Sequence, residues 1–225
     1  MGLRLFHITE FAQSSMFTPA VQRESRHPFS LMLWISLWLA TACNLPLWQR
    51  LWQIPELGLG GFLWSATLLT LMMVLGLCAI LSLFNWQHGL LRMLLTLLLL
   101  ASALNTHLLL QAGRFVDMAM LRDPLQALRP FLGWPMLLPM FVLAILPSFW
   151  VWSTPLRRIR MSRRLSQNFY FLLAVLTLLG GLWLLSLSQL QPLLRTHPQL
   201  GHLITPGNTL LSVAKALGGE RWRLP

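Results

Sequence analysis

Acidic residues are scarce in this chain, and charge of either sign is rare. Six Asp and Glu stand against seventeen Lys and Arg, and charged residues make up 10% of the sequence while hydrophobic residues make up 56%. A soluble domain of 225 residues needs a polar surface, which so few charged side chains cannot supply. The composition excludes a soluble globular protein and predicts an integral membrane protein.

Cysteine is nearly absent, and recognisable catalytic motifs are missing. Cys43 and Cys78 both fall inside apolar runs, so no disulfide framework is indicated. No G-x-S-x-G, P-loop, H-E-x-x-H or kinase signature occurs. His197 and His202 lie five residues apart, which is a poor helical spacing for metal ligands. We therefore expect no catalytic residue, no metal site and no cofactor in this chain.

Basic residues dominate the few charges, with a formal net charge of +11. In a soluble chain this excess would suggest nucleic acid. Here the arginines lie between apolar runs, so we expect no nucleic-acid partner. Their position instead favours a role in membrane topology and contact with anionic lipid.

Five apolar stretches are long enough to cross a membrane as helices, at 29–48, 61–84, 90–110, 131–152 and 169–190. The sequence thus predicts an all-α integral membrane fold. We expect a cytoplasmic N-terminal segment at 1–28, a five-helix transmembrane domain at 29–190, and a periplasmic surface segment with a truncated linker at 191–225. Within the last segment, residues 209–217 predict a short amphipathic helix on the outer membrane surface.

The arginine distribution predicts the orientation. The linker between the fourth and fifth spans carries five arginines and no acidic residue: Arg157, Arg158, Arg160, Arg163 and Arg164. We expect this linker and the N-terminus in the cytoplasm, and the C-terminus in the periplasm of a bacterial inner membrane.

Prolines and polar residues inside the spans predict local features. Pro135, Pro139 and Pro147 predict a kink or break in the fourth span, and a bent structural helix is favoured over a transport gate. Asn105, Thr106 and His107 lie inside the third span. A hydrogen bond between helices is favoured for them over a functional role.

The outer loop at 113–130 carries charges of both signs at the level of the lipid headgroups. Asp117 and Asp123 would contact the amine of a zwitterionic lipid, and Arg122 its phosphate. A solvated loop whose surface ion pairs contribute little is favoured over this headgroup site.

Three stretches, in this order within five spans, carry a resemblance to a family. They are NLPLWQRLWQI at 44–54, GRFVDMAMLRD at 113–123 and LRTHPQLGHLITPGNTLLSVAKAL at 194–217. They resemble the span-one exit, the outer loop and the linking surface segment of the N-terminal membrane domain of the phosphoethanolamine–lipid A transferases.

The resemblance implies a membrane module of an enzyme that moves phosphoethanolamine from phosphatidylethanolamine to lipid A. In the family, the chemistry uses a phosphoryl-threonine and zinc in a periplasmic domain that follows the tail. We expect that this domain is missing, that the chain is inactive alone, and that it binds phospholipid or associates with a separate catalytic partner. Asp123 and Ala127 stand where the family has Asn and Thr, and no Glu follows at 128–132.

Two other readings remain open at this point. One is a non-enzymatic inner-membrane interaction or scaffold protein. The other is a small-solute transporter, which is less favoured because the spans carry no charge except Arg92 near an end.

A reporter fusion tests the predicted orientation. Alkaline phosphatase fused after Pro225 should be active, because it folds in the periplasm, whereas green fluorescent protein fused there should not fluoresce. A fluorescent green fluorescent protein and an inactive alkaline phosphatase would contradict the orientation in which the linker and the N-terminus lie in the cytoplasm.

Overall fold

The computed structural model describes residues 25–85, 87–113, 133–156, 161–197, 200, 203–205 and 207. Most of the backbone there is helical, and the only strand-like pairing among these residues is one bridge between Arg26 and Leu156. Five segments are long and apolar enough to cross a membrane: Pro28–Trp52, Pro55–Leu83, His88–Gln111, Trp134–Ser153 and Arg163–Leu187. The predicted all-α membrane fold is confirmed. The amphipathic helix predicted at 209–217 lies outside the described residues.

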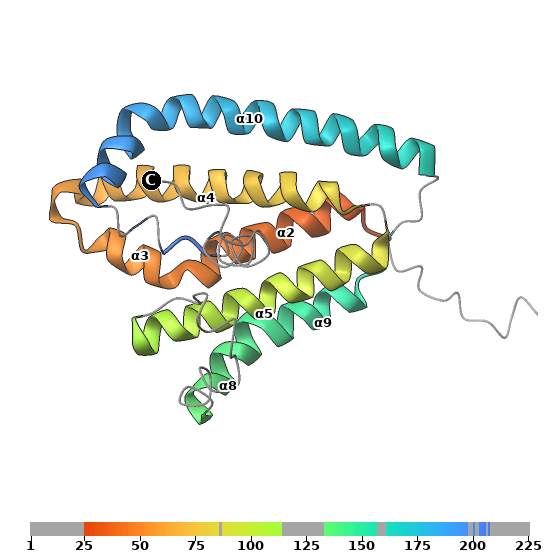
Figure 1. The fold of residues 1–225 in the computed structure, drawn as a ribbon, viewed down its shortest axis with the longest axis horizontal. Coiled ribbons are helices and arrows are strands. Elements are labelled where there is room, and N and C mark those ends of the chain that lie inside the picture. Colours follow the sequence, from red (N-terminus) through yellow and green to blue (C-terminus); the bar gives the residue numbers. More distant parts are fainter. Residues whose placement is uncertain are drawn as a thin grey trace, which may run out of the picture.

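The α-helices, in chain order, are α2 (Pro28–Thr41), α3 (Leu45–Trp52), α4 (Gly58–Leu83), α5 (His88–Ala112), α8 (Trp134–Met140), α9 (Leu146–Ser153) and α10 (Met161–Thr196). Figure 1 shows the spans in a row, with α10 on α4, α2 between α4 and α5, and α8 with α9 on the other side of α5. In the first span 56% of the apolar stretch is buried, but in the fifth only 11%. The first three spans therefore form the core, and the last two flank it.

The helix ends form two groups that differ in charge. The end where α2, α5 and α10 begin carries four arginines and no acidic residue within the described part of the chain: Arg26, Arg92, Arg163 and Arg164. We call this the basic end. The opposite end, where α10 finishes, carries Arg50, Arg195, His197 and the acidic Glu56, and we call it the tail end.

Leucine side chains fill the centre of the bundle. Leu39, Leu81, Leu95 and Leu99 are fully buried in one cluster built from α2, α4, α5 and the fourth span. Large apolar side chains outside this cluster, such as Leu97 at 63% exposure, face outward. This distribution suits a membrane, where lipid replaces water around the apolar exterior.

The fourth span is interrupted, as its prolines predict. A π-helical turn, η4 (Phe141–Ile145), separates α8 from α9, and the N–H of Leu146 donates to the carbonyl of Phe141. In an α-helix the carbonyl of Leu143 would accept a hydrogen bond from the N–H of residue 147. That residue is Pro147, which has no N–H to donate. The indole N–H of Trp38 on α2 donates to that carbonyl at 3.4 Å. A neighbouring helix thus satisfies the group that proline leaves without its usual donor.

Polar contacts anchor the start of α10 at the basic end. Arg164 is 8% exposed, and its Nη2 donates to Asn85 Oδ1 at 3.0 Å, while its Nη1 lies 3.2 Å from His88 Nδ1. Asn168 donates to the carbonyl of Ser82 at 2.7 Å. These contacts hold α10 against the turn between α4 and α5. The fifth spanning helix, α10, consequently begins eight residues before the span predicted at 169–190.

Truncating a core leucine tests the packing. Leu95→Ala should lower the free energy of unfolding by about 2 kcal/mol or more. The shorter side chain leaves a cavity, and the side chains that surround it lose packing contacts. Thermal unfolding of the purified protein in detergent measures the change. Leu97→Ala is the matched control, since its side chain faces outward two residues away on α5. Equal destabilisation by both variants would contradict the assignment of the core.

Candidate functional site

The first span breaks before it reaches the tail end. The helix changes to a 3₁₀ turn, η1 (Ala42–Asn44), and Pro46 stands in the first turn of α3. Three carbonyl groups around this break accept side-chain hydrogen bonds. The pairs are Asn44 Nδ2 to Leu39 O at 2.8 Å, Trp48 Nε1 to Thr41 O at 3.0 Å, and Thr106 Oγ1 to Cys43 O at 2.6 Å.

The chain beyond α10 returns to this break and is clamped there. Asn44 donates its Nδ2 to the carbonyl of Thr205 at 2.7 Å and accepts the N–H of Thr205 on Oδ1 at 2.8 Å. Asn105 on α5 donates to Thr205 Oγ1 at 2.7 Å. Both asparagines and Thr205 are completely buried. We call these three residues the tail clamp.

The tail clamp settles part of the prediction for the third span. Asn105 and Thr106 form hydrogen bonds that reach other elements of the chain, as expected. His107 is 2% exposed beside them. Asn105 and Thr106 therefore join α5 to the tail and to the first span, and the hydrogen bond expected for His107 stays a prediction.

Apolar packing supports the clamp. Leu200 inserts beside Leu47 and Leu51 of α3 and is 3% exposed. Leu203 and Ile204 pack against the same cluster. The residues that follow α10 are thus held on the bundle by buried leucines as well as by the clamp.

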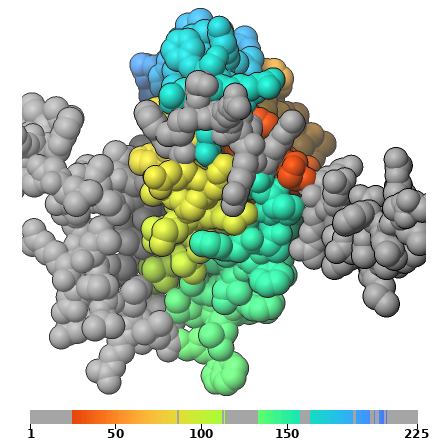
Figure 2. Space-filling model, turned by 90° about the vertical axis from the view of Figure 1, so that its right-hand side faces the viewer, coloured from red at the N-terminus to blue at the C-terminus, as the bar shows by residue number. Residues whose placement is uncertain are grey.

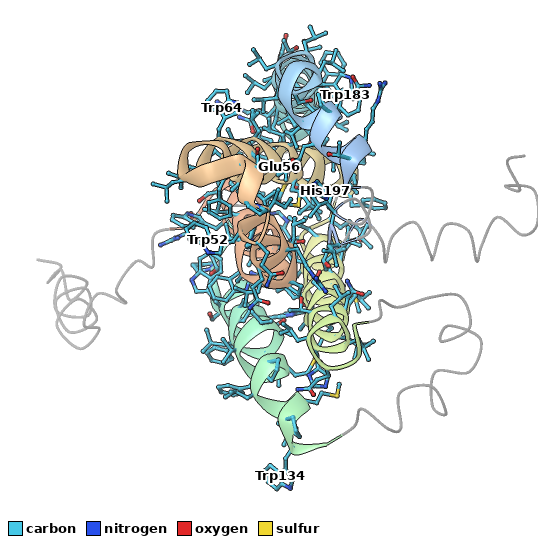
Figure 3. The ribbon with its side chains drawn as sticks, turned by 90° about the vertical axis from the view of Figure 1, so that its left-hand side faces the viewer. Trp52, Glu56, Trp64, Trp134, Trp183 and His197 are labelled. Carbon is cyan, nitrogen blue, oxygen red and sulfur yellow. The ribbon has the colours of Figure 1, made fainter. Side chains whose placement is uncertain are left out.

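A small polar cleft opens beside the clamped tail. Its volume is about 230 Å³, and it is lined by Arg50, Gln53, Ile54, His197, Leu200 and Leu203. Arg50 and Gln53 are exposed at the end of α3, and His197 directly follows α10. Figure 3 views the molecule from this end, with Glu56 and His197 labelled. We call this hollow the tail-end cleft.

The lining of the cleft suits an anion. Arg50 presents a planar guanidinium that binds phosphate oxygens in pairs, and Gln53 adds a neutral amide donor. A zinc site needs several His, Cys, Asp or Glu ligands, whereas this cleft has one imidazole and a cation, so it does not fit zinc. Among the described residues, no three such side chains gather to hold a metal ion.

Exposed tryptophans lie around the same end. Trp52 ends α3 and Trp64 lies in the second turn of α4, and each is about half exposed or more (Figure 3). Tryptophan is enriched where the hydrocarbon meets the headgroups of a membrane. This placement puts the cleft near the headgroup level.

The site residues predicted from the sequence cannot be placed. Asp117, Arg122 and Asp123 lie outside the described residues, as does His202, and the headgroup site built on them stays a prediction. The sequence reasoning did not select Arg50, Gln53 and His197 for lipid binding. The signal that existed for Arg50 and Gln53 was the stretch NLPLWQRLWQI, which holds both residues and Asn44.

Comparison with known proteins assigns the chain to a family. A family model described as phosphoethanolamine transferase EptA/EptB matches residues 73–220, more than half of the chain. The chain belongs to this family. None of the curated proteins compared with it matches.

A solved structure agrees with this assignment. The fold is similar to the integral membrane protein lipooligosaccharide phosphoethanolamine transferase A (EptA) from Neisseria meningitidis, with a TM-score of 0.72 and 16% identity. The match covers 87% of this chain but 37% of that chain. The chain therefore has the fold of the membrane part of this family and spans little more than a third of that transferase.

Removing one amide tests the tail clamp. Asn44→Ala should destabilise the docked tail by about 1–3 kcal/mol, because it leaves buried polar groups of Thr205 unpaired. Hydrogen–deuterium exchange of the peptide at 197–207 should then become faster. Gln49→Ala, an exposed change on α3, is the control and should leave the exchange unchanged. Unchanged protection in Asn44→Ala would contradict the clamp.

Proposed function

We propose that this chain is the membrane part of a phosphoethanolamine transferase that uses phosphatidylethanolamine as donor and lipid A as acceptor. Membership of the EptA/EptB family supports the reaction class. The observation that carries the proposal is the tail-end cleft, where Arg50 lines a polar hollow beside the clamped tail.

The cleft would hold the phosphate of the lipid headgroup. Arg50 supplies a charge-assisted contact to the phosphate oxygens, with Gln53 and His197 as further partners. The ammonium group needs an acidic partner, and Glu56 is the only acidic residue in the described part of the chain, at this same end (Figure 3). Asp117 and Asp123 are the other candidates, on the expectation that the loop 113–130 lies on this side.

In this proposal the chain binds and positions lipid but does not itself transfer the phosphoryl group. Its cleft does not fit zinc, so the threonine and zinc chemistry implied by the family resemblance belongs to a catalytic domain of the alkaline-phosphatase type. The chain without such a domain would be inactive. The tail clamp would fix where that domain starts relative to the membrane surface.

The proposed location is the bacterial inner membrane. The basic end would face the cytoplasm, because arginine-rich segments are retained there. The tail end, with its cleft, would then face the periplasm, where a catalytic domain and lipid A meet.

Lipid A mass spectra test this function. We expect a phosphoethanolamine mass shift in cells that produce this chain together with a soluble periplasmic transferase domain, and none when the domain or the chain is omitted. A shift with the domain alone would show that the chain contributes nothing. No shift in any strain would favour a non-enzymatic role.

The same assay tests the cleft. Arg50→Ala should reduce the mass shift about fivefold or more, because it removes the cation that would hold the phosphate. Arg195→Ala is the matched control, since this exposed arginine lies at the same end outside the cleft. An equal reduction by both variants would point to general surface charge instead of a specific headgroup contact.

A further inference from the structure

A second hollow lies at the opposite end of the protein, between α2 and α9. Its volume is about 340 Å³, and it is lined by Arg26, Trp34, Ile35, Trp38, Leu146, Pro147 and Trp150. Figure 2 looks onto the basic end, where the red start of α2 lies beside the blue-green end of α9. We call this hollow the inner groove.

The inner groove exists because α2 and α9 both pack on α5. Trp38 spans the gap at its deep end, where the indole N–H donates to the carbonyl of Leu143. The outer walls remain open to the membrane, since Trp34 is 57% exposed and Leu146 is 55% exposed. The groove is thus an apolar slot that faces lipid, with tryptophan on both sides.

The length of the groove matches one leaflet. Arg26 stands two residues before α2, and Trp38 lies ten residues after the first residue of α2. Ten helical residues rise about 15 Å. Half of the hydrocarbon core of a bilayer is about 15 Å thick. One acyl chain of a lipid in this leaflet would therefore run the length of the slot.

Charge at the mouth of the groove selects the headgroup. The guanidinium carbon of Arg26 lies 5.8 Å from the centre of the Trp150 ring, and its backbone N–H donates to the carbonyl of Pro155 at 2.9 Å. No described residue forms a hydrogen bond or ion pair with its guanidinium. Arg92, which stacks at the same distance on Trp152, instead donates to the carbonyl of Thr154 at 2.6 Å.

The surroundings of Arg26 favour an anionic lipid over a zwitterionic one. The only acidic residue in the described part of the chain, Glu56, lies at the opposite end. The sequence places eight arginines and two glutamates in segments 1–28 and 153–168, and both glutamates lie in undescribed residues. Because arginines outnumber acidic residues eight to two in these segments, a headgroup with a net negative charge would be stabilised more than a zwitterionic one.

We propose that the inner groove binds one anionic glycerophospholipid, with an acyl chain between α2 and α9 and its phosphate on Arg26. Such a lipid would join α9 to α2 in place of direct helix packing. The inference is independent of the headgroup site proposed at the tail end.

Native mass spectrometry of the purified chain tests this binding. Phosphatidylglycerol should remain bound one to one, several-fold more tightly than phosphatidylethanolamine with the same acyl chains. Arg26→Gln should weaken phosphatidylglycerol binding about fivefold, because this is the contribution of one arginine to the affinity for anionic lipid at a membrane surface. Arg163→Gln, an exposed arginine at the same end that does not line the groove, should leave binding unchanged.

A second pair of variants tests the acyl chain. Leu146→Trp should fill the slot and release the lipid, whereas Ile145→Trp, at an equally exposed neighbour outside the lining, should not. Thermal unfolding of all four variants checks that they remain folded. The proposal would be overturned if the protein retained both lipids equally. It would also be overturned if Arg163→Gln lost as much phosphatidylglycerol as Arg26→Gln, or if Leu146→Trp retained all of its bound lipid. None of these outcomes bears on the lipid A assay.

Discussion

Backbone polar groups inside a membrane need hydrogen-bond partners from the protein, and this constraint organises the bundle. Two of the five spans break, and each break exposes carbonyl groups where lipid offers no donor. Asn44, Trp48 and Thr106 supply donors at the first break, and Trp38 supplies one at the fourth span. Because some of these donors come from other helices, the breaks fix how the helices sit against one another.

The fifth span packs on α4 and has polar contacts at both of its ends. Little of α10 is buried along its apolar stretch. Arg164 ties its start to the turn between α4 and α5, and Thr205 ties the chain beyond its end to the first and third spans. These contacts and the packing on α4 together set the position of α10, while much of its middle faces lipid. The same tether places His197 beside Arg50 in the tail-end cleft.

The two ends of the protein offer different chemistry to lipid. The tail end combines Arg50 with amide, imidazole and acidic side chains, which suits a zwitterionic headgroup. The basic end combines arginine with tryptophan and, among its described residues, no acid. One protein would thus hold phosphatidylethanolamine on the side of the transfer reaction and an anionic lipid on the other side. The second lipid would stabilise the bundle without entering the reaction.

The number of spans, their order and the break in the fourth were all predictable from the sequence. Runs of about twenty apolar residues must span a membrane as helices, and proline removes an N–H wherever it stands. The order of weak motifs indicated the family, and the family comparison confirmed it. The charged loop selected for headgroup binding remains a prediction, because Asp117, Arg122 and Asp123 lie outside the described residues.

Local properties could be derived from the residues alone: which segments are helical, where they break and which parts are apolar. The packing of the helices in three dimensions sets which distant residues meet. Asn44 and Thr205 are 161 residues apart, and no spacing rule links them. The inner groove likewise needs α2 and α9 to diverge across α5, and the tail-end cleft needs the tail to fold back onto α3. Contacts of this kind depend on how whole helices pack, and helical periodicity carries no information about that.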